Sequence, residues 1–339
     1  MEILKPTPQN VSKCAEMLRN GELVAFPTET VYGLGGNALN LKAVAKIFEV
    51  KKRPVFDPLI VHISDRKMLQ QVVPGLSSAV RKLTEKFWPG PLTIVAEKAE
   101  LIPDLVTAGM PTVAVRMPNH PVALSLIKRA KMPIAAPSAN LFNRTSPTEA
   151  SAVRQQLQGR VSAVLDGGKC RVGVESTIVK AQGKILSVLR PGAVTVEMLR
   201  EVFDGKVISV RKPLKEIQPG GIEKHYAPET AAFLADKKLS DTESYILRKM
   251  KSSGKKPKLG LVGFGKIRSL TVWDRAVSLS EVKNLNEAAE NLFSTMRWMD
   301  GLKLDGIVFK RIPEKSVGVA VMDRIRKACH GNNIEDLFK

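Results

Sequence analysis

Residues 47–63 constrain the fold most, because a helix must end and a strand must begin within this short stretch. The apolar periodicity over residues 41–48 predicts an amphipathic helix. Pro54 ends it, since proline lacks an N–H donor and disfavours helical backbone at the residue before it. The apolar run over residues 59–63 then predicts a strand. A helix that passes directly into a strand is typical of α/β proteins.

Three consecutive cations and one histidine lie inside this stretch. Lys51, Lys52 and Arg53 come at the end of the helix, where the helix dipole favours positive charge. His62 lies in the strand that follows. The cations either form a solvated helix end, which is a common helix stop signal, or line a site for an anion.

The same alternation recurs along the chain and predicts an α/β domain. Strands are expected at residues 23–26, 59–63, 92–96, 112–118, 134–140, 161–165, 174–179 and 186–190. Helices are expected at residues 10–19, 41–48, 75–86 and 122–130. Several of the strands end in Thr, Ser, Asn or Arg, and ligands gather where the strands of an open α/β sheet end. This pattern suggests a small phosphorylated ligand without specifying a reaction.

Three polar features follow or interrupt these strands. Residues 27–37 predict a loop with hydroxyls, a carboxylate and glycines, which is either a functional loop or a tight turn. Ser138 and Asn140 are either ligands or ordinary turn residues. Arg116 lies among apolar residues of a strand, and arginine is seldom buried without a partner. We favour an anion ligand for Arg116 over an edge-strand cation.

Beyond residue 206 the sequence becomes rich in Pro and Gly and has no periodic apolar face. We therefore predict domains at 1–206 and 230–339, joined by a linker over 207–229. The second domain reads as a smaller α/β unit. Its strands are expected at residues 231–235, 259–263 and 306–309, and its helices at 242–251, 286–299 and 316–329. Gly263-Phe-Gly265 is a weak nucleotide-binding motif, because the third glycine of the fingerprint is missing.

Composition limits the possible partners. The net charge of +20 favours polyanionic partners or phosphate-bearing substrates, while 5% aromatic residues argue against base-stacking modules. Both parts of the chain are basic, with 32 cations and 19 anions up to residue 228 and 21 and 14 beyond it. Three widely spaced cysteines make a poor disulfide framework. With no signal peptide or membrane-spanning run in view, we expect a cytoplasmic protein without a membrane partner.

Taken together, the motifs resemble the threonylcarbamoyl-AMP synthase family, which has a YrdC-type domain. They are Pro27-Thr-Glu-Thr-Val-Tyr-Gly-Leu-Gly, Lys51-x-Arg53-Pro, Asp57-Pro-Leu-Ile-Val-His-Ile63, Trp88-Pro-Gly-Pro-Leu-Thr93, Thr112-Val-Ala-Val-Arg-x-Pro118, Pro137-Ser-Ala-Asn140, Glu175-Ser-Thr-Ile178 and Arg190-Pro-Gly192. The resemblance covers about residues 10–205, and His225-Tyr-Ala-Pro228 with the second domain resembles the longer form of the family. It implies a YrdC-like twisted mixed sheet with helices, followed by a smaller Rossmann-like α/β domain.

The resemblance also implies a nucleotidyltransferase reaction. L-threonine, bicarbonate or CO2, and ATP give threonylcarbamoyl-AMP and pyrophosphate, with Mg²⁺ accompanying the ATP. The product would pass to a separate threonylcarbamoyl transferase complex that modifies tRNA, and weak tRNA binding by this chain stays open. Such a reaction depends on positioning and on neutralising charge rather than on a covalent nucleophile.

The resemblance assigns roles to individual residues. Threonine would be held by Thr30, His62, Arg116, Ser176 and the backbone near Ala136. ATP would be surrounded by Arg53, Asp57, Thr112, Ser138, Asn140, Ser146, Arg190 and Tyr226, with His225 beside Tyr226 in a lid. The family's catalytic set corresponds to Lys51, Arg53, Ser138 and Asn140. The resemblance assigns no protein side chain as a metal ligand, and Asp57 would either act through Mg²⁺ or make a weaker contact with the phosphates.

Departures from the family pattern leave some roles open. Asp57 stands where the family often has Asn, and Arg144 is either a phosphate contact or a solvent-facing residue. Gly221 and Lys224 replace bulkier linker residues. Two other functions remain: a non-catalytic RNA-binding module, and a carbamoyltransferase of the hydrogenase-maturation type. The lack of acylphosphatase and zinc-finger segments argues against the second.

Overall fold

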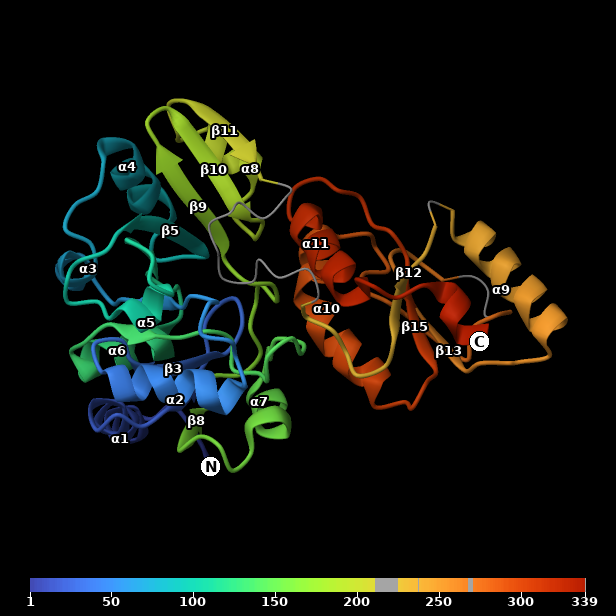
Figure 1. Cartoon of the computed structure of the whole chain (residues 1–339), viewed down its shortest axis with the longest axis horizontal. Coiled ribbons are helices and arrows are strands. Elements are labelled where there is room, and N and C mark those ends of the chain that lie inside the picture. The colour runs from blue at the N-terminus through green and yellow to red at the C-terminus, as the bar shows by residue number, and fades with distance from the viewer. Residues whose placement is uncertain (211–224, 237, 268–270, 339) are drawn as a thin grey trace. The chain divides into compact units, whose positions relative to one another are not determined.

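The structure, a computed structural model, describes residues 1–210, 225–236, 238–267 and 271–338. Contacts between Cα atoms divide the chain into two compact units. Unit 1 takes in residues 1–142 and 146–221, and unit 2 takes in residues 143–145 and 222–339. In Figure 1 unit 1 is coloured from blue to yellow and most of unit 2 from orange to red.

A mixed sheet forms the centre of unit 1. Its strand order is β1-β8-β2-β3-β7-β4-β6-β5-β9-β10-β11. The strands are β1 (Glu2–Leu4), β2 (Val24–Phe26), β3 (Gly33–Asn37), β4 (Ile60–His62), β5 (Leu92–Glu97), β6 (Thr112–Arg116), β7 (Ile134–Ala135), β8 (Ala163–Leu165), β9 (Thr177–Gln182), β10 (Ile185–Arg190) and β11 (Lys206–Ser209). Parallel and antiparallel pairs both occur, so the mixed α/β fold expected from the sequence is confirmed.

Helices cover this sheet, and side-chain caps mark where several of them begin. They are α1 (Pro8–Arg19), α2 (Leu41–Lys51), α3 (Arg66–Val72), α4 (Ser78–Phe87), α5 (Asp104–Thr107), α6 (Pro121–Ala130), α7 (Ala150–Leu157) and α8 (Val196–Arg200). Thr7, Asn40 and Ser77 cap α1, α2 and α4 by accepting backbone N–H groups through their side chains. Each capped helix turns an apolar face toward the sheet. The α2 face, for example, buries Val44 and Ile47.

The stretch from 47 to 63 folds as its sequence predicts, with one refinement. Helix α2 ends at Lys51, and Lys52 adopts the left-handed conformation with φ 52° before the chain reaches β4. Residues 60–62 form β4, which lies between β7 and β6 in the sheet. Lys51 and Arg53 are buried and Lys52 is exposed, so the three neighbouring cations lie in different environments.

The glycine-rich part of the predicted loop is a strand, which corrects the sequence prediction. Residues 33–37 form β3, which pairs antiparallel with β2 and β7. At Gly35 an added Cβ would lie 2.7 Å from the Phe26 ring, so the glycine lets that ring pack against the strand. Only residues 27–32 connect β2 to β3 as a loop. Glycine breaks the hydrophobic alternation from which strands are recognised, and the pattern therefore concealed this one.

Short elements also escaped the sequence reading. They are β1, β11, β14, α3, α5 and α8. Strand β1, for instance, is three residues long and pairs in parallel with β8, far away in the sequence. Such elements are stabilised by tertiary pairing more than by their own periodicity.

Unit 2 is a smaller α/β unit around a parallel sheet. Its strand order is β12-β15-β13-β14, and the strands are β12 (Ala232–Leu234), β13 (Leu259–Gly263), β14 (Arg275–Ser278) and β15 (Gly306–Phe309). Helices α10 (Leu285–Asp300) and α11 (Gly318–Cys329) lie on one side of it and α9 (Leu239–Ser253) on the other (Figure 1). The 3-10 helix η1 (Ile334–Phe338) comes last. All the strand pairs are parallel, as in doubly wound sheets.

The described ends of the predicted linker belong to the folded units. Strand β11 pairs with β10 as far as Ser209, so unit 1 extends beyond residue 206. His225 and Tyr226 are buried and pack within unit 2. The rest of the 207–229 linker, residues 211–224 with Gly221 and Lys224, lies outside the described residues.

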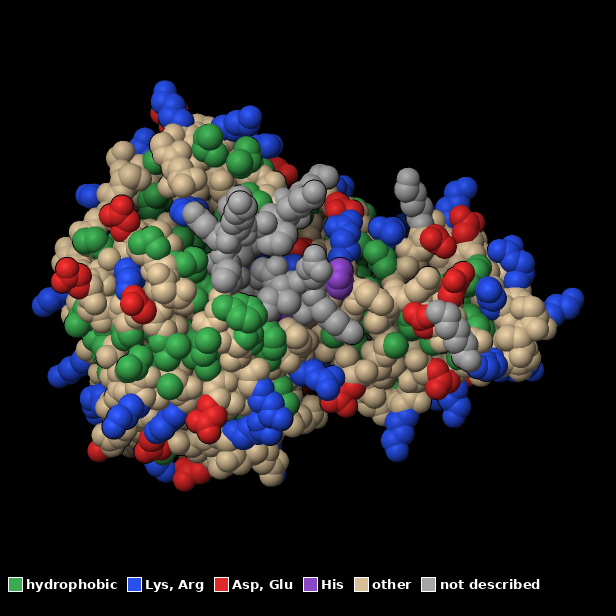
Figure 2. Space-filling model, viewed as in Figure 1, with side chains coloured by type: hydrophobic (Ala, Val, Ile, Leu, Met, Phe, Trp, Pro, Cys, Tyr) green, Lys and Arg blue, Asp and Glu red, His purple; other side chains and the backbone are tan. Residues whose placement is uncertain are grey.

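Charge is distributed widely over the face that Figure 2 shows. Lys and Arg side chains are spread across it with Asp and Glu among them, rather than gathered in one patch. Among the residues described, every helix is too short or too polar to span a bilayer.

Candidate functional site

Arg116 is the centre of a buried polar cluster in unit 1. Arg116 and His62 are the last residues of β6 and β4, and the two strands pair in parallel with these residues in register. Thr30 and Glu29 come from the loop between β2 and β3. All four side chains are at most 4% exposed. We call these four residues the Arg116 cluster.

The guanidinium of Arg116 is held on three sides. Its Nε donates to Gly90 O at 3.2 Å and its Nη1 donates to Thr30 Oγ1 at 2.9 Å. Its Nη2 lies 2.7 Å from Oε1 of Glu29 in an ion pair. A guanidinium has five N–H donors in a rigid fork, so N–H groups remain for an incoming carboxylate.

His62 supplies an uncharged imidazole to the cluster. Burial, with a smaller contribution from Arg116, lowers the pKa of His62 to about 3. Its Nδ1 lies 3.3 Å from Ile60 O, and its ring meets Phe26 edge to face with centroids 6.2 Å apart. At neutral pH the only formal charges in the Arg116 cluster are therefore one cation and one carboxylate.

A second buried cation, Arg190, is the last residue of β10. Its Nε donates to Ser176 O and its Nη2 to Ser176 Oγ, each at 3.0 Å. The Ser176 hydroxyl also lies 2.7 Å from Thr93 Oγ1. Gly192 allows this approach, because an added Cβ would lie 2.4 Å from Thr177 N and 2.6 Å from Glu175 O. The structure thus joins the Glu175-Ser-Thr and Arg190-Pro-Gly motifs through direct contacts.

Lys51 reaches the segment that follows β7. It is 1% exposed, and its Nζ donates to Ser138 O at 2.6 Å and to Asn140 O at 2.5 Å. Burial, reinforced by Arg53, holds the pKa of Lys51 well below its usual range. The Asn140 side chain donates to Leu141 O at 2.6 Å. Lys51, Ser138 and Asn140 of the predicted catalytic set are therefore together, and Lys51 fixes the backbone of the loop that carries the other two.

Arg53 and Asp57 form a second buried ion pair. Arg53 Nη2 lies 2.8 Å from Asp57 Oδ1, with side-chain exposures of 6% and 0%. Arg53 also donates from Nε to Asp57 O and from Nη2 to Pro58 O, which closes the turn after α2. The carboxylate that replaces the family's usual Asn is thus a counter-ion to Arg53.

Three further predicted site residues also belong to unit 1. Ser146 is fully buried and donates to Glu175 Oε1. Ala136 donates its backbone N–H to Ile60 O at 2.9 Å. Thr112 begins β6 whereas Arg116 ends it, so about 13 Å of strand separates the two. The structure does not bring Thr112 into the Arg116 cluster.

Tyr226 and Arg144 lie in unit 2. Tyr226 is 2% exposed, stacks on His225 with centroids 4.0 Å apart, and packs against Phe293. The Arg324 guanidinium lies 5.3 Å from the centroid of the same ring. Arg144 Nη2 pairs with Glu229 Oε1 at 3.1 Å.

In the parts of the chain that the structure describes, no three His, Cys, Asp or Glu side chains are grouped as a metal ion would require. The described residues therefore offer Mg²⁺ no cluster of three such side chains. Its involvement stays a proposal, as an ion carried on the phosphates of ATP.

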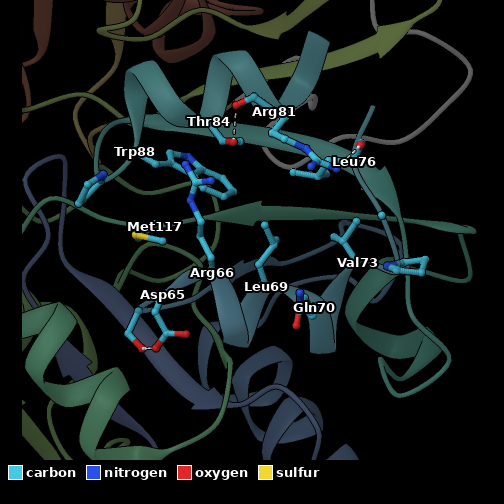
Figure 3. A pocket seen from close by; sticks show the side chains of 14 residues that line it. Asp65, Arg66, Leu69, Gln70, Val73, Leu76, Arg81, Thr84, Trp88 and Met117 are labelled. Carbon is cyan, nitrogen blue, oxygen red and sulfur yellow. Dashed lines mark hydrogen bonds between the residues drawn. The ribbon is translucent and has the colours of Figure 1, made fainter. Parts of the chain in front are cut away.

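A separate pocket of about 570 Å³ lies between α3 and α4. Figure 3 shows Arg66 extending from α3 toward Trp88, with Arg81 on the opposite side of the opening. Met117, which follows Arg116, also lines this pocket. None of the predicted site residues lines it.

Sequence reasoning missed the partners of the site residues. Glu29 and Glu175 stood inside recognised motifs, and Thr93 ended another, yet none was assigned a role. A buried carboxylate beside a cation leaves only a weak signature in one sequence. The signal that could have found Glu29 is the acidic residue itself, enclosed in a run of hydroxyl and apolar residues.

Comparison with known families gives two adjoining matches that together span most of the chain. Residues 16–192 match the Sua5_yciO_yrdC family, described as telomere recombination. Residues 194–329 match the family described as the threonylcarbamoyl-AMP synthase C-terminal domain. The two matches meet close to β10 and α8 of unit 1.

Individual relatives agree with these matches. The threonylcarbamoyl-AMP synthase of Pyrococcus abyssi is 39% identical and that of Bacillus subtilis is also 39% identical. The alignments cover 93% and 98% of this chain, and 92% and 96% of those proteins. The crystal structure of P. abyssi Sua5 complexed with L-threonine is similar at a TM-score of 0.86 and 38% identity, covering 95% of each chain.

Proposed function

Because the chain belongs to the threonylcarbamoyl-AMP synthase family, we propose that it forms threonylcarbamoyl-AMP and pyrophosphate from L-threonine, bicarbonate or CO2, and ATP. The enzyme is a nucleotidyltransferase. The observation that carries the assignment is the convergence of Thr30, His62 and Arg116 in one buried cluster. The related P. abyssi structure is described as a complex with L-threonine.

The Arg116 cluster is the threonine half of the site. An α-carboxylate fits the remaining N–H donors of Arg116, since guanidinium and carboxylate pair in a bidentate fashion. The neutral imidazole of His62 and the hydroxyl of Thr30 offer hydrogen bonds to a small polar substrate. Ser176, fixed by Arg190, would complete the threonine contacts.

The chemistry requires two anions to meet. The amine of threonine adds to CO2 and releases a proton, which gives a carbamate. A carbamate oxygen then forms a bond to the α-phosphorus of ATP, and the bond from that phosphorus to the bridging oxygen of pyrophosphate breaks. Buried cations lower the repulsion between these species. Arg53 and Arg190, with the Lys51-braced loop at Ser138 and Asn140, are the groups that would surround ATP.

The remaining assignments are part of the same proposal. Asp57, Thr112, Ser146 and Tyr226 are proposed nucleotide contacts, and the backbone near Ala136 is a proposed threonine contact. Mg²⁺ would neutralise charge on the phosphates. A tRNA-modifying transferase complex would accept the product in the cytoplasm. The alternative of a non-catalytic RNA-binding module is not supported, because relatives that match almost the whole chain are named as synthases.

The decisive experiment measures pyrophosphate release from ATP by the full-length protein. We expect release only when threonine and bicarbonate are both present. Serine and a reaction without bicarbonate serve as controls. Pyrophosphate release that does not depend on threonine, or no release under any condition, would overturn the proposal.

A further inference from the structure

Glu29 is a buried carboxylate that the assigned machinery does not use. It is 4% exposed, and neither of its oxygens accepts a hydrogen bond within the residues that the structure describes. Its one strong contact is the ion pair with Arg116 Nη2 at 2.7 Å. A carboxylate can accept hydrogen bonds at about four lone-pair positions, so most of its acceptor capacity is unfilled.

A buried carboxylate with unused hydrogen-bond positions destabilises the fold unless a ligand donates hydrogen bonds to it. A buried polar atom without a hydrogen bond costs about 1–3 kcal/mol, and a charged one costs more. A buried ion pair offsets its desolvation only when further hydrogen bonds satisfy the remaining atoms. The unfilled acceptor positions of Glu29 therefore suggest a hydrogen-bond donor, and preferably a cation, that arrives with the substrate.

The charges of the Arg116 cluster match an amino acid. Arg116 carries one positive charge, Glu29 carries one negative charge, and His62 is neutral. A zwitterion presents one carboxylate and one ammonium group a few ångströms apart. Arg116 alone would favour any small carboxylate. The Arg116–Glu29 pair would distinguish an amino acid from the same acid without its α-amino group.

Resting on the proposed function, we propose that Glu29 positions threonine by accepting hydrogen bonds from its α-ammonium group while Arg116 holds the α-carboxylate. After the amine becomes a carbamate, its remaining N–H still donates to Glu29. Glu29 thereby makes the site specific for substrates that carry an α-amino group.

The experiment pairs a substitution with a change of ligand. Threonine and 3-hydroxybutyrate, which is threonine without its amino group, are titrated by calorimetry into the wild-type protein and into Glu29→Gln, without ATP. We expect Glu29→Gln to weaken threonine binding roughly 10- to 100-fold, as for loss of a charged hydrogen bond. The same substitution should leave 3-hydroxybutyrate binding unchanged or tighten it, because it removes a negative charge.

Parallel weakening of both ligands would indicate a merely structural role and overturn the inference, as would unchanged threonine affinity. Threonine methyl ester, which keeps the ammonium and lacks the carboxylate, is the matched probe. Its binding should depend on Glu29 and much less on Arg116. Glu29→Asp keeps the charge and serves if Glu29→Gln does not fold. Its loss of threonine affinity should be smaller.

The two proposals fail in different ways. Wild-type protein that releases pyrophosphate with threonine, combined with a Glu29→Gln variant of unchanged ligand preference, refutes only the role of Glu29. Wild-type protein that neither binds threonine nor releases pyrophosphate refutes the proposed function first.

Discussion

Two groups of buried cations in unit 1 use the same residue types in different ways. Lys51 and Arg53 give most of their hydrogen bonds to backbone carbonyls, at Ser138, Asn140, Asp57 and Pro58. Arg116 gives two of its three contacts to side chains, Thr30 and Glu29. A carbonyl in a fixed turn cannot leave, whereas a side chain can move aside for a ligand. We therefore propose that the first group builds the site and that the second exchanges partners with substrate.

The largest expected effect tests the building role of Lys51. Lys51→Met keeps the apolar stem and removes the donor from two buried carbonyls, each worth about 1–3 kcal/mol. We expect the free energy of unfolding, measured in denaturant, to fall by about 2–4 kcal/mol and activity to be lost with it. A variant of wild-type stability that has lost only activity would place Lys51 on the substrate instead.

The next effect tests the exchanging role of Arg116. Arg116→Ala removes the carboxylate partner, and a charged hydrogen bond is worth about 1.5–3 kcal/mol. We expect KM for threonine to rise roughly 10- to 150-fold while KM for ATP changes little. Initial rates of pyrophosphate release at varied concentrations of each substrate provide the measurement. Unchanged affinity for threonine would remove Arg116 from the threonine half of the site.

A third prediction concerns His62 and pH. Its folded pKa of about 3 lies below the unfolded value near 6.5, so the unfolded chain binds the extra proton between these values. The contribution of His62 to the free energy of unfolding is therefore fully present above about pH 6.5 and is lost as the pH falls toward 3. Within that window, each fall of one pH unit lowers the free energy of unfolding by up to about 1.4 kcal/mol.

The measurement compares unfolding free energies at pH 7 and pH 5 for wild type and His62→Gln. We expect the wild type to lose about 2 kcal/mol more than the variant between these conditions. Equal losses would show that the imidazole is not kept neutral by its surroundings.

The smallest effect concerns Lys52, which lies between two buried cations and is itself exposed. It has φ 52°, where glycine carries no steric cost. Lys52→Gly should change stability by less than about 1 kcal/mol and leave pyrophosphate release unchanged. It is the matched control for Lys51→Met. A large loss of activity would show that the exposed cation contacts a substrate.

Sequence alone determined the α/β class and the second α/β unit, and it singled out candidate site residues whose roles the family resemblance then suggested. Helix periodicity and Pro54 located the end of α2, and short apolar runs located β4, β6 and β10. Their polar last residues, His62, Arg116 and Arg190, were recognisable because charged and polar groups are rare inside buried strands. These signals are local, so one chain suffices to reveal them.

Only the tertiary structure decided which groups meet. It turned residues 33–37 from a loop into β3 and placed Tyr226 in unit 2. It also paired Arg116 with Glu29, which lies 87 positions earlier in the chain. Such pairings depend on sheet order and on the close approaches allowed by glycines such as Gly35 and Gly192. Periodicity within a segment carries no information about a partner so far away in the sequence.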